Sequence, residues 1–298
     1  MASLKEVKDR INSVKSTRKI TSAMKMIASS KLRRSQQAIN SFLPYSTKLS
    51  DILINLLASD SSFDSPYAQT RDIKRKAVLA FSSNSSLAGA FNANINKELT
   101  SVISESEKLS KDNITIYPIG KKVTDYVRKR DWVYEQNPDF INMADKPSFQ
   151  MILDLSKELI AKFLSGELDE IILIYTHFYS MGVQKVTRKV YLPFDLQSVQ
   201  EKLGEDSHTV ALTDYILEPS KEKLLSELIP KVLASNLFAA LLDSNASENA
   251  ARSLAMQIAT DNATELIGDL TIEYNKNRQA AITNELLDII GGAAALNQ

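Results

Sequence analysis

The feature that most constrains this chain is a stretch of sixty residues, 231–290, with no proline and a single glycine, Gly268. Glycine and proline are the residues that most often interrupt helices, so the stretch predicts one very long helix. At ~1.5 Å per residue it would span roughly 90 Å, whereas an ordinary globular helix has about 11–12 residues. One compact domain cannot bury such a helix, which therefore needs a partner along its length.

A second segment of this kind opens the chain, because residues 1–43 contain neither glycine nor proline. Its apolar side chains recur at intervals of three and four, first on one stripe and then on a shifted one. They are Leu4, Val7, Ile11, Val14, Ile20, Met24 and Ile27. The pattern predicts an amphipathic helix with imperfect heptads. Pro44 could end or kink it, and the apolar spacing of residues 49–57 indicates that helix then resumes.

The two ends of the chain carry opposite charge, although the whole chain is neutral. Residues 1–34 hold ten basic side chains against two acidic ones, and residues 231–298 hold four basic against eight acidic. Opposite charge favours pairing of the two ends with each other. The surplus basic residues fit a solvated helix face, a contact with an acidic protein loop, or nucleic-acid binding. The absence of aromatic residues from positions 1–41 disfavours the last.

The middle of the chain alternates strand and helix patterns. Strands are expected at residues 77–82, 114–119, 170–178 and 183–192, and helices at 88–109, 121–130 and 149–164. This order predicts a small Rossmann-like α/β domain with a mostly parallel sheet. The expected architecture is an antiparallel coiled coil of the two end helices with the α/β domain inserted between them. The expected parts are 1–58, 75–210 and 211–298.

The sequence contains few candidates for chemistry. It has no cysteine, which excludes disulfides and thiol catalysis, and it lacks both a P-loop and a Gly-x-Gly-x-x-Gly turn. A serine-rich turn at 82–86 could hold an anion or cap a helix. His177 and His208 lie far apart, and His177 is expected to be structural. The sequence has no run of 18 apolar residues, so it predicts no transmembrane helix. We therefore expect no active site, cofactor or metal.

Both ends of the chain resemble one known family. The motifs are ITSAMKMIASSKLRR at 20–34, AARSLAM at 250–256, ATDNA at 259–263, YNKNRQAAITNEL at 274–286 and GGAAA at 291–295. They resemble the gamma subunit of bacterial F-type ATP synthases. The middle is similar only loosely, at residues 191–193 (YLP) and 214–219 (DYILEP).

The resemblance implies a central rotor shaft that couples transmembrane proton or sodium flow to ATP synthesis or hydrolysis. Its partners would be the ring of three alpha and three beta subunits, the epsilon subunit and the membrane-embedded c-ring of Fo. The chain would be non-catalytic and would bind no cofactor, nucleic acid or small-molecule substrate. It would be peripheral on the cytoplasmic side of the cell inner membrane and associated with it only through the complex.

The resemblance also implies contact residues, motif by motif. Those expected to meet a beta subunit are Met24, Lys25, Arg252, Gln279, Thr283 and Glu285. Those expected to meet the c-ring, from the globular foot, are Tyr215 and Glu218. The apolar tip, residues 289–296, would sit in the bearing of the ring. Lys25 stands where many relatives carry an acid, and the serine-rich turn replaces a more glycine-rich one.

Two functions of other classes remain open on the residues alone. The first is a non-catalytic coiled-coil scaffold or tether with an α/β head, which would not need the terminal GGAAA. The second is an enzyme that uses the α/β domain, which would require nucleotide or substrate binding within residues 70–210.

Overall fold

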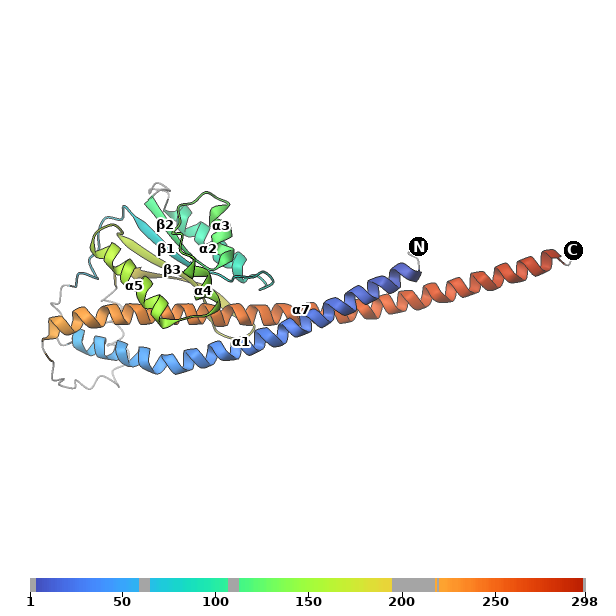
Figure 1. Ribbon diagram of the computed structural model, residues 1–298, viewed down its shortest axis with the longest axis horizontal. Coiled ribbons are helices and arrows are strands. Elements are labelled where there is room, and N and C mark those ends of the chain that lie inside the picture. Colours follow the sequence, from blue (N-terminus) through green and yellow to red (C-terminus); the bar gives the residue numbers. More distant parts are fainter. Residues whose placement is uncertain (1–3, 59–64, 107–112, 195–217, 219, 297–298) are drawn as a thin grey trace. The chain divides into compact units, whose positions relative to one another are not determined.

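Two long helices, α1 (Leu4–Ala58) and α7 (Lys221–Leu296), form the two ends of the chain. The computed structural model describes residues 4–58, 65–106, 113–194, 218 and 220–296 (Figure 1). Both helices are longer than the punctuation of the sequence predicts. Pro44 lies inside α1 and does not end it, and α7 begins well before residue 231 and runs through Pro230.

Pro230 is accommodated in α7 by a contact from outside the helix. Proline has no N–H, so the carbonyl four residues earlier, that of Ser226, loses its helical partner. The Tyr67 hydroxyl donates to this carbonyl at 3.4 Å. This long contact gives the Ser226 carbonyl a partner in place of the missing helical N–H.

One helical segment, Lys223–Ile290, is long and apolar enough to cross a membrane by length and composition, with a mean hydropathy of 1.4 in its most apolar window. Of that window, 56% is buried inside the chain. A core helix of a folded protein has the same properties, so the segment gives only weak evidence for a membrane span.

The chain divides into two compact units, and both long helices contribute to each. The coil unit consists of Met1–Ser29 and Arg252–Gln298, and the sheet unit consists of Ser30–Ala251. Each is described below by itself. The three parts expected from the sequence, 1–58, 75–210 and 211–298, follow the elements rather than these units, and their boundaries remain a prediction.

In the coil unit, α1 and α7 meet along a heptad seam. The α1 positions at alternating intervals of four and three are all buried or half-buried: Val7, Ile11, Val14, Arg18, Thr21, Lys25 and Ala28. The matching α7 positions are Ser253, Met256, Thr260, Ala263, Ile267, Leu270 and Tyr274. A repeat of 3.5 residues keeps one stripe of each helix against its partner, as in a coiled coil.

Contacts across the seam show that the helices run antiparallel. Thr21 Oγ1 lies 2.8 Å from Thr260 Oγ1, and Ser29 Oγ lies 2.8 Å from Ser253 Oγ. Nearer the start of α1, Val7 and Ile11 pack with Leu270. Residue numbers therefore rise along α1 as they fall along α7, which confirms the predicted antiparallel coiled coil.

One prediction about this seam is wrong. Ile20 and Ile27 belong to the stripe expected to face the partner helix, but each side chain is 60% exposed. The seam instead uses Thr21 and Ala28, of which 8% and 1% are exposed. Hydrophobicity selected the wrong face here because the packed residues are small or polar.

The sheet unit is built around a four-stranded sheet in the order β2-β1-β3-β4. Its strands are β1 (Lys76–Phe81), β2 (Ile114–Ile119), β3 (Glu170–Phe178) and β4 (Gln184–Leu192). β1 pairs in parallel with β2 and β3, and β4 pairs antiparallel with β3. This confirms the predicted fold class, a mostly parallel α/β sheet between two long helices.

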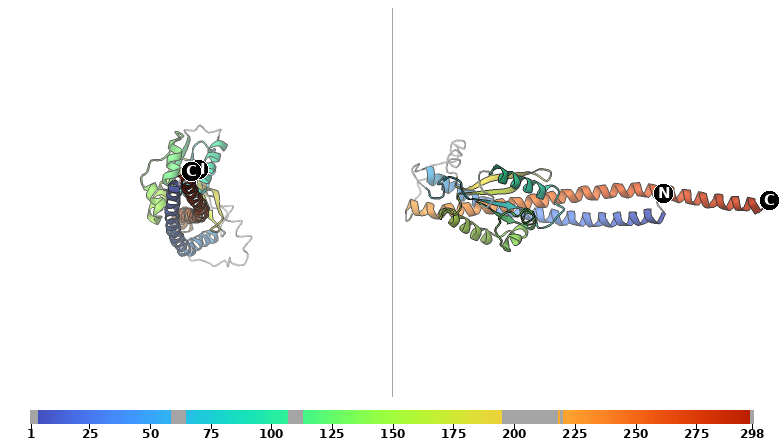
Figure 2. Two further views of the ribbon diagram at one scale, coloured as in Figure 1. Left: turned by 90° about the vertical axis from the view of Figure 1, so that its right-hand side faces the viewer. Right: turned by 90° about the horizontal axis from the view of Figure 1, so that it is seen from above.

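Helices cover both faces of the sheet (Figures 1 and 2). On one face lie α2 (Phe91–Glu105) and α3 (Lys121–Arg128), which pack on Val78 and Ala80 of β1. On the other lie α4 (Asp139–Asp145) and α5 (Phe149–Leu164), together with α7 and the end of α1. The sequence patterns did not predict α4. The paired long helices thus form part of the core of the sheet unit.

Candidate partner-binding surface

The serine-rich turn after β1 caps a helix. The Val123 N–H donates to Ser82 Oγ at 2.9 Å, and the Lys121 N–H donates to Asn84 Oδ1 at 3.0 Å. The Lys122 N–H donates to the Ser83 carbonyl of the same turn at 3.0 Å. These are the donors that a bound anion would need. The capping interpretation is right in kind, but the capped helix is α3, whose N-cap residue Gly120 has no side chain and whose first N–H groups bond to the turn instead.

The crevice where α/β sheets usually bind ligands is filled. Such sites lie beyond the carboxyl ends of the strands where the strand order reverses, here between β1 and β3. Leu241, Ser244 and Asn245 of α7 lie at the end of β1 against Ser82 and leave a cavity of about 10 Å³. That is at most the space one water needs. At the end of β1, α7 therefore leaves no room for a nucleotide.

His177 joins β3 to α7. Its Nδ1 forms a short contact with Asp243 Oδ2, and Asp243 Oδ1 accepts the Phe178 N–H at 2.9 Å. Both residues line a cavity of about 450 Å³ that also includes Tyr175. Burial, and then the charge of Asp243, raise the pKa of Tyr175, so it stays protonated. The structural role predicted for His177 fits these contacts, and His208 lies outside the described residues.

The residues expected to meet a beta subunit differ in exposure. Gln279, Thr283 and Glu285 are exposed near the end of α7. Met24 and Lys25 are half-buried on α1, with Lys25 in the heptad seam. A seam position turns part of the Lys25 side chain toward the partner helix, so less of it faces outward.

Three of these residues can be placed more closely within the coil unit. Arg252 is only 8% exposed and directly precedes Ser253, which bonds to Ser29 across the seam. Gln279 and Thr283 lie one turn apart on the same face, and Thr283 Oγ1 donates to the Gln279 carbonyl at 2.9 Å. Arg252 is thus mostly buried, whereas the other two form an exposed pair. Glu285 lies on a different face of α7 from this pair.

The residues expected to meet the c-ring can be placed only in part. Glu218 is exposed, and Tyr215 lies outside the described residues. Both assignments therefore remain predictions.

The coil unit also exposes apolar side chains that the motifs did not indicate as contacts. On α1 these are Ile20, Met26 and Ile27, each at least 60% exposed. On the last turns of α7 they are Ile282, Leu286 and Leu287. They adjoin Ile289 and Ile290, which are also exposed and belong to the tip expected to sit in the bearing of the ring. Beyond Tyr274, α7 continues past the start of α1 (Figures 1 and 2). Clustered exposed apolar residues are typical of partner-binding surfaces.

Comparisons with known proteins identify the family. A family model described as ATP synthase matches residues 3–296. An ATP synthase gamma chain of Bacteroides thetaiotaomicron is 55% identical over 298 residues, which covers 98% of this chain and 99% of the relative. The chain belongs to the ATP synthase gamma chain family. A gamma chain of Macrococcus caseolyticus is 41% identical and covers 99% of this chain and 100% of its own length.

Chains in solved ATP synthase structures share the fold of this chain. A chain in the OSCP/F1/c-ring structure of the Euglena gracilis mitochondrial ATP synthase, rotational state 3, matches with a TM-score of 0.62 and 20% identity. That match covers 98% of this chain and 94% of the other. A chain of the rotor of the same enzyme in rotational state 1 matches with a TM-score of 0.60 and 20% identity. At this identity the likeness concerns the fold alone.

The gamma chain family match spans both the coil unit and the sheet unit. The relatives align over nearly their full lengths, so their similarity is not confined to the two ends of the chain. The sequence motifs lie in α1 and α7, the two helices that carry this candidate surface, and the contacts assigned to them remain predictions. The motifs missed Ile20, Met26 and Ile27 because an apolar residue on a predicted helix is first assigned to its packed face.

Proposed function

We propose that this chain is the central rotor shaft of a bacterial F-type ATP synthase and has no catalytic site of its own. The observation that carries the proposal is the match to gamma chains over nearly the whole length of the chain. The shaft would turn inside a ring of three alpha and three beta subunits and would bind epsilon and the c-ring. It would lie on the cytoplasmic side of the cell inner membrane, held there only by the complex.

The heptad seam supports a mechanical role. A single helix twists and bends easily, whereas two helices joined by interdigitating side chains share the load. Hydroxyl pairs such as Thr21–Thr260 fix the register of the two helices through directional bonds. A shaft also has to contact each beta conformer differently, because a partner with equal affinity for all states shifts none of them.

The filled crevice supports the absence of catalysis. In a nucleotide-binding α/β domain the carboxyl ends of the strands are open to a ligand. In this chain Leu241, Ser244 and Asn245 of α7 occupy that position. Nucleotides would then be bound by other subunits of the complex, which agrees with the missing P-loop.

The exposed residues of the coil unit are the proposed contacts with the beta subunits. The pair Gln279 and Thr283 would meet a loop of one beta subunit. Glu285, on a different face of α7, would meet a beta subunit in another conformation as the shaft turns. Met24 and Lys25 would contribute through their exposed parts. Because Arg252 is mostly buried, we expect it to shape the coil surface as well as to touch a partner. Tyr215 and Glu218 would face the c-ring.

The proposal is tested by reconstitution with alpha and beta subunits, followed by single-molecule rotation and ATP turnover. We expect a complex of three alpha, three beta and one copy of this chain that rotates during hydrolysis. Gln279→Ala should lower turnover, while the matched control Gln37→Ala, at an exposed helix position outside the motifs, should not. A chain that stays monomeric beside alpha and beta, or a complex that hydrolyses ATP without rotation, would sink the proposal.

A further inference from the structure

Six of the seven residues 243–249 of α7 are polar, directly after buried Leu241 and Leu242. Three of them, Asp243, Asn245 and Ser247, bond to other elements of the sheet unit. Residues four apart share a helix face and a residue midway between them faces the other way. Asp243 and Ser247 therefore point to one side of α7, and Asn245 points to the other.

Toward the sheet, two of these side chains hold the end of β3. Asp243 Oδ1 accepts the Phe178 N–H at 2.9 Å, and Asp243 also contacts His177. Ser247 Oγ donates to the Thr176 carbonyl at 2.9 Å, and Ser247 is fully buried. These bonds fix α7 to the last residues of a central strand.

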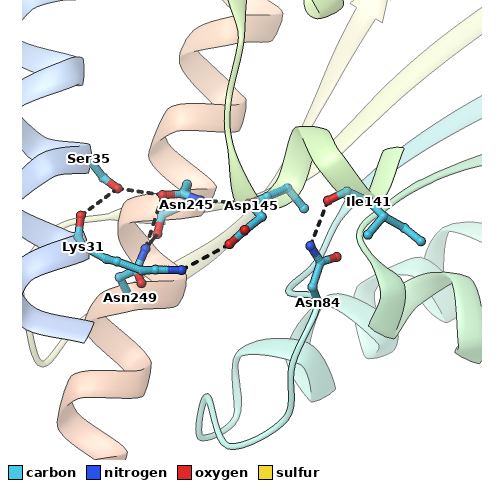
Figure 3. A network of polar contacts seen from close by, with 8 residues as sticks. Lys31, Ser35, Asn84, Ile141, Asp145, Asn245 and Asn249 are labelled. Carbon is cyan, nitrogen blue, oxygen red and sulfur yellow. Dashed lines mark hydrogen bonds and ion pairs between the residues drawn. The ribbon is translucent and has the colours of Figure 1, made fainter. Parts of the chain in front are cut away.

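On its other side, α7 is bonded to α4 and α1 through one amide group (Figure 3). Asn245 Nδ2 donates to the Ala144 carbonyl in the last turn of α4 at 2.9 Å. Asn245 Oδ1 accepts from Ser35 Oγ of α1 at 2.6 Å. The Asn249 side chain supports this amide from one turn further along, at 3.2 Å. The Asn245 side chain of α7 is thus bonded to both α1 and α4.

A neighbouring ion pair joins the same elements but contributes little. Lys31 Nζ lies 3.1 Å from Asp145 Oδ1, and both side chains are about half exposed (53% and 54%). Exposed pairs of this kind are weakened by solvent and salt. The bonds of Asn245, Ser247 and Asp243, which are buried or part-buried, are therefore the specific part of the contact.

Directional bonds are what such a contact needs if it carries force. The apolar packing of Phe140 and Met143 in α4 against the core is favourable but non-directional, so it resists separation more than sliding. A hydrogen bond weakens steeply when its angle or length changes. Bonds from one helical turn to both β3 and α4 therefore fix the axial and rotational position of α7 against the sheet.

We propose that Asp243, Asn245 and Ser247 form a joint that transmits torque between the sheet with its helix α4 and the paired long helices α1 and α7. The proposal rests on the rotor function given above. The three residues are positioning residues, since they touch no substrate. Without them the sheet would still fold around α7 but would slip against it under load.

The test uses the full complex with its c-ring in vesicles. Asn245→Asp places an oxygen against the Ala144 carbonyl and keeps the Ser35 bond. Ser35→Ala keeps the Ala144 bond and removes the Ser35 hydroxyl, which bonds to Asn245 and to the Lys31 carbonyl of its own helix. Gln257→Ala is the control, because it removes a bond within α7 to Asp261. The chain has no cysteine, so cysteines introduced at exposed Asn142 and Asn40 allow specific spin labelling of α4 and α1.

Two quantities are measured: the distribution of label distances, and the ions transported per ATP hydrolysed. For Asn245→Asp we expect a displaced population about fivefold larger than in the parent chain, as follows from losing one hydrogen bond of ordinary strength. We also expect fewer ions per ATP at unchanged hydrolysis, with a smaller effect for Ser35→Ala and none for Gln257→Ala. A lower melting temperature with unchanged distances and unchanged ions per ATP would overturn the joint. A parent complex that neither rotates nor transports ions would instead refute the rotor function.

Discussion

Gly268 is the one glycine in the most helical stretch of the chain, and its replacement gives a sharp test of what stabilises the coil unit. It lies in the interior of α7 at an exposed position. A Cβ atom built there meets nothing within 4 Å. Within the described residues Gly268 is therefore not required by a close helix crossing. What remains is the conformational freedom that glycine loses on entering a helix.

The expected magnitude follows from helix propensity alone. Alanine is favoured over glycine in a helix interior by about 0.8–1 kcal/mol. No burial or cavity change adds to this at an exposed site, so Gly268→Ala should raise the free energy of unfolding by about 1 kcal/mol. Urea unfolding of the isolated chain, followed by far-UV circular dichroism, should show a higher midpoint with an unchanged slope.

Gly120→Ala is the matched control, because the same methyl group should there have the opposite effect. Gly120 has φ +102°, and its added Cβ would lie 2.2 Å from the Ser82 carbonyl oxygen. That backbone region alone costs an alanine roughly 1–3 kcal/mol, and the backbone contact adds to it. An unchanged or lower midpoint for Gly268→Ala, beside destabilised Gly120→Ala, would refute the propensity argument. A stabilised Gly268→Ala chain that lowers turnover in the complex would instead locate a partner at residue 268.

Three further predictions concern the cores, the seam and the surface. Burial raises the pKa of Tyr191, so stability should fall above about pH 10, where the unfolded chain ionises first; Tyr191→Phe should flatten this decline in unfolding measured across pH. Replacing Thr21 and Thr260 together with valine should leave the unfolding free energy within about 1 kcal/mol, since two buried methyls offset one hydroxyl pair. Replacing exposed Ile20 and Ile27 with serine should leave unfolding unchanged but weaken binding to the alpha and beta subunits, measured by co-purification.

The long helices could be predicted because they depend on what the sequence omits. Without glycine and proline nothing interrupts them, and the alternating strand and helix patterns between them fixed the fold class. The boundaries failed where a tertiary contact compensates a local breaker. Pro230 lies inside α7, where Tyr67 donates to the carbonyl that proline leaves free, and no local pattern shows that contact.

The seam was mispredicted for a different reason. Period analysis assumes that packed positions are apolar, whereas Arg18, Thr21 and Lys25 occupy seam positions and Ile20 and Ile27 do not. Counting the seam in strict steps of three and four from Val7 would have found it. The apolar residues outside that register then become the signal for a partner surface, since a chain that buried them itself would need no partner there.

The polar groups of the sheet unit were beyond sequence reasoning because their partners are distant in the chain. Ser82 caps a helix that begins about forty residues later, and Asn245 bonds to Ala144 and Ser35, more than one hundred residues earlier in the sequence. Each bond exists only once the fold has brought its elements together. Only the presence of polar residues in an apolar stretch of α7 was visible beforehand.

The filled crevice connects these observations. In an enzyme of this fold the carboxyl ends of β1 and β3 would have to stay open. Here Leu241 of α7 lies at the end of β1, and Asp243 and Asn245 bond α7 to β3 and α4. The chain's own helix thus lies where other domains of this fold bind a ligand. Leu241→Ala would leave a cavity at this contact and lower the unfolding free energy by roughly 2–5 kcal/mol, since Leu241 is 2% exposed. It should not create nucleotide binding, because the first N–H groups of α3 would still donate to Ser82, Ser83 and Asn84 of the serine-rich turn. Nucleotide binding by that variant, measured by calorimetry, would show that the crevice is a suppressed active site rather than an anchor for the shaft.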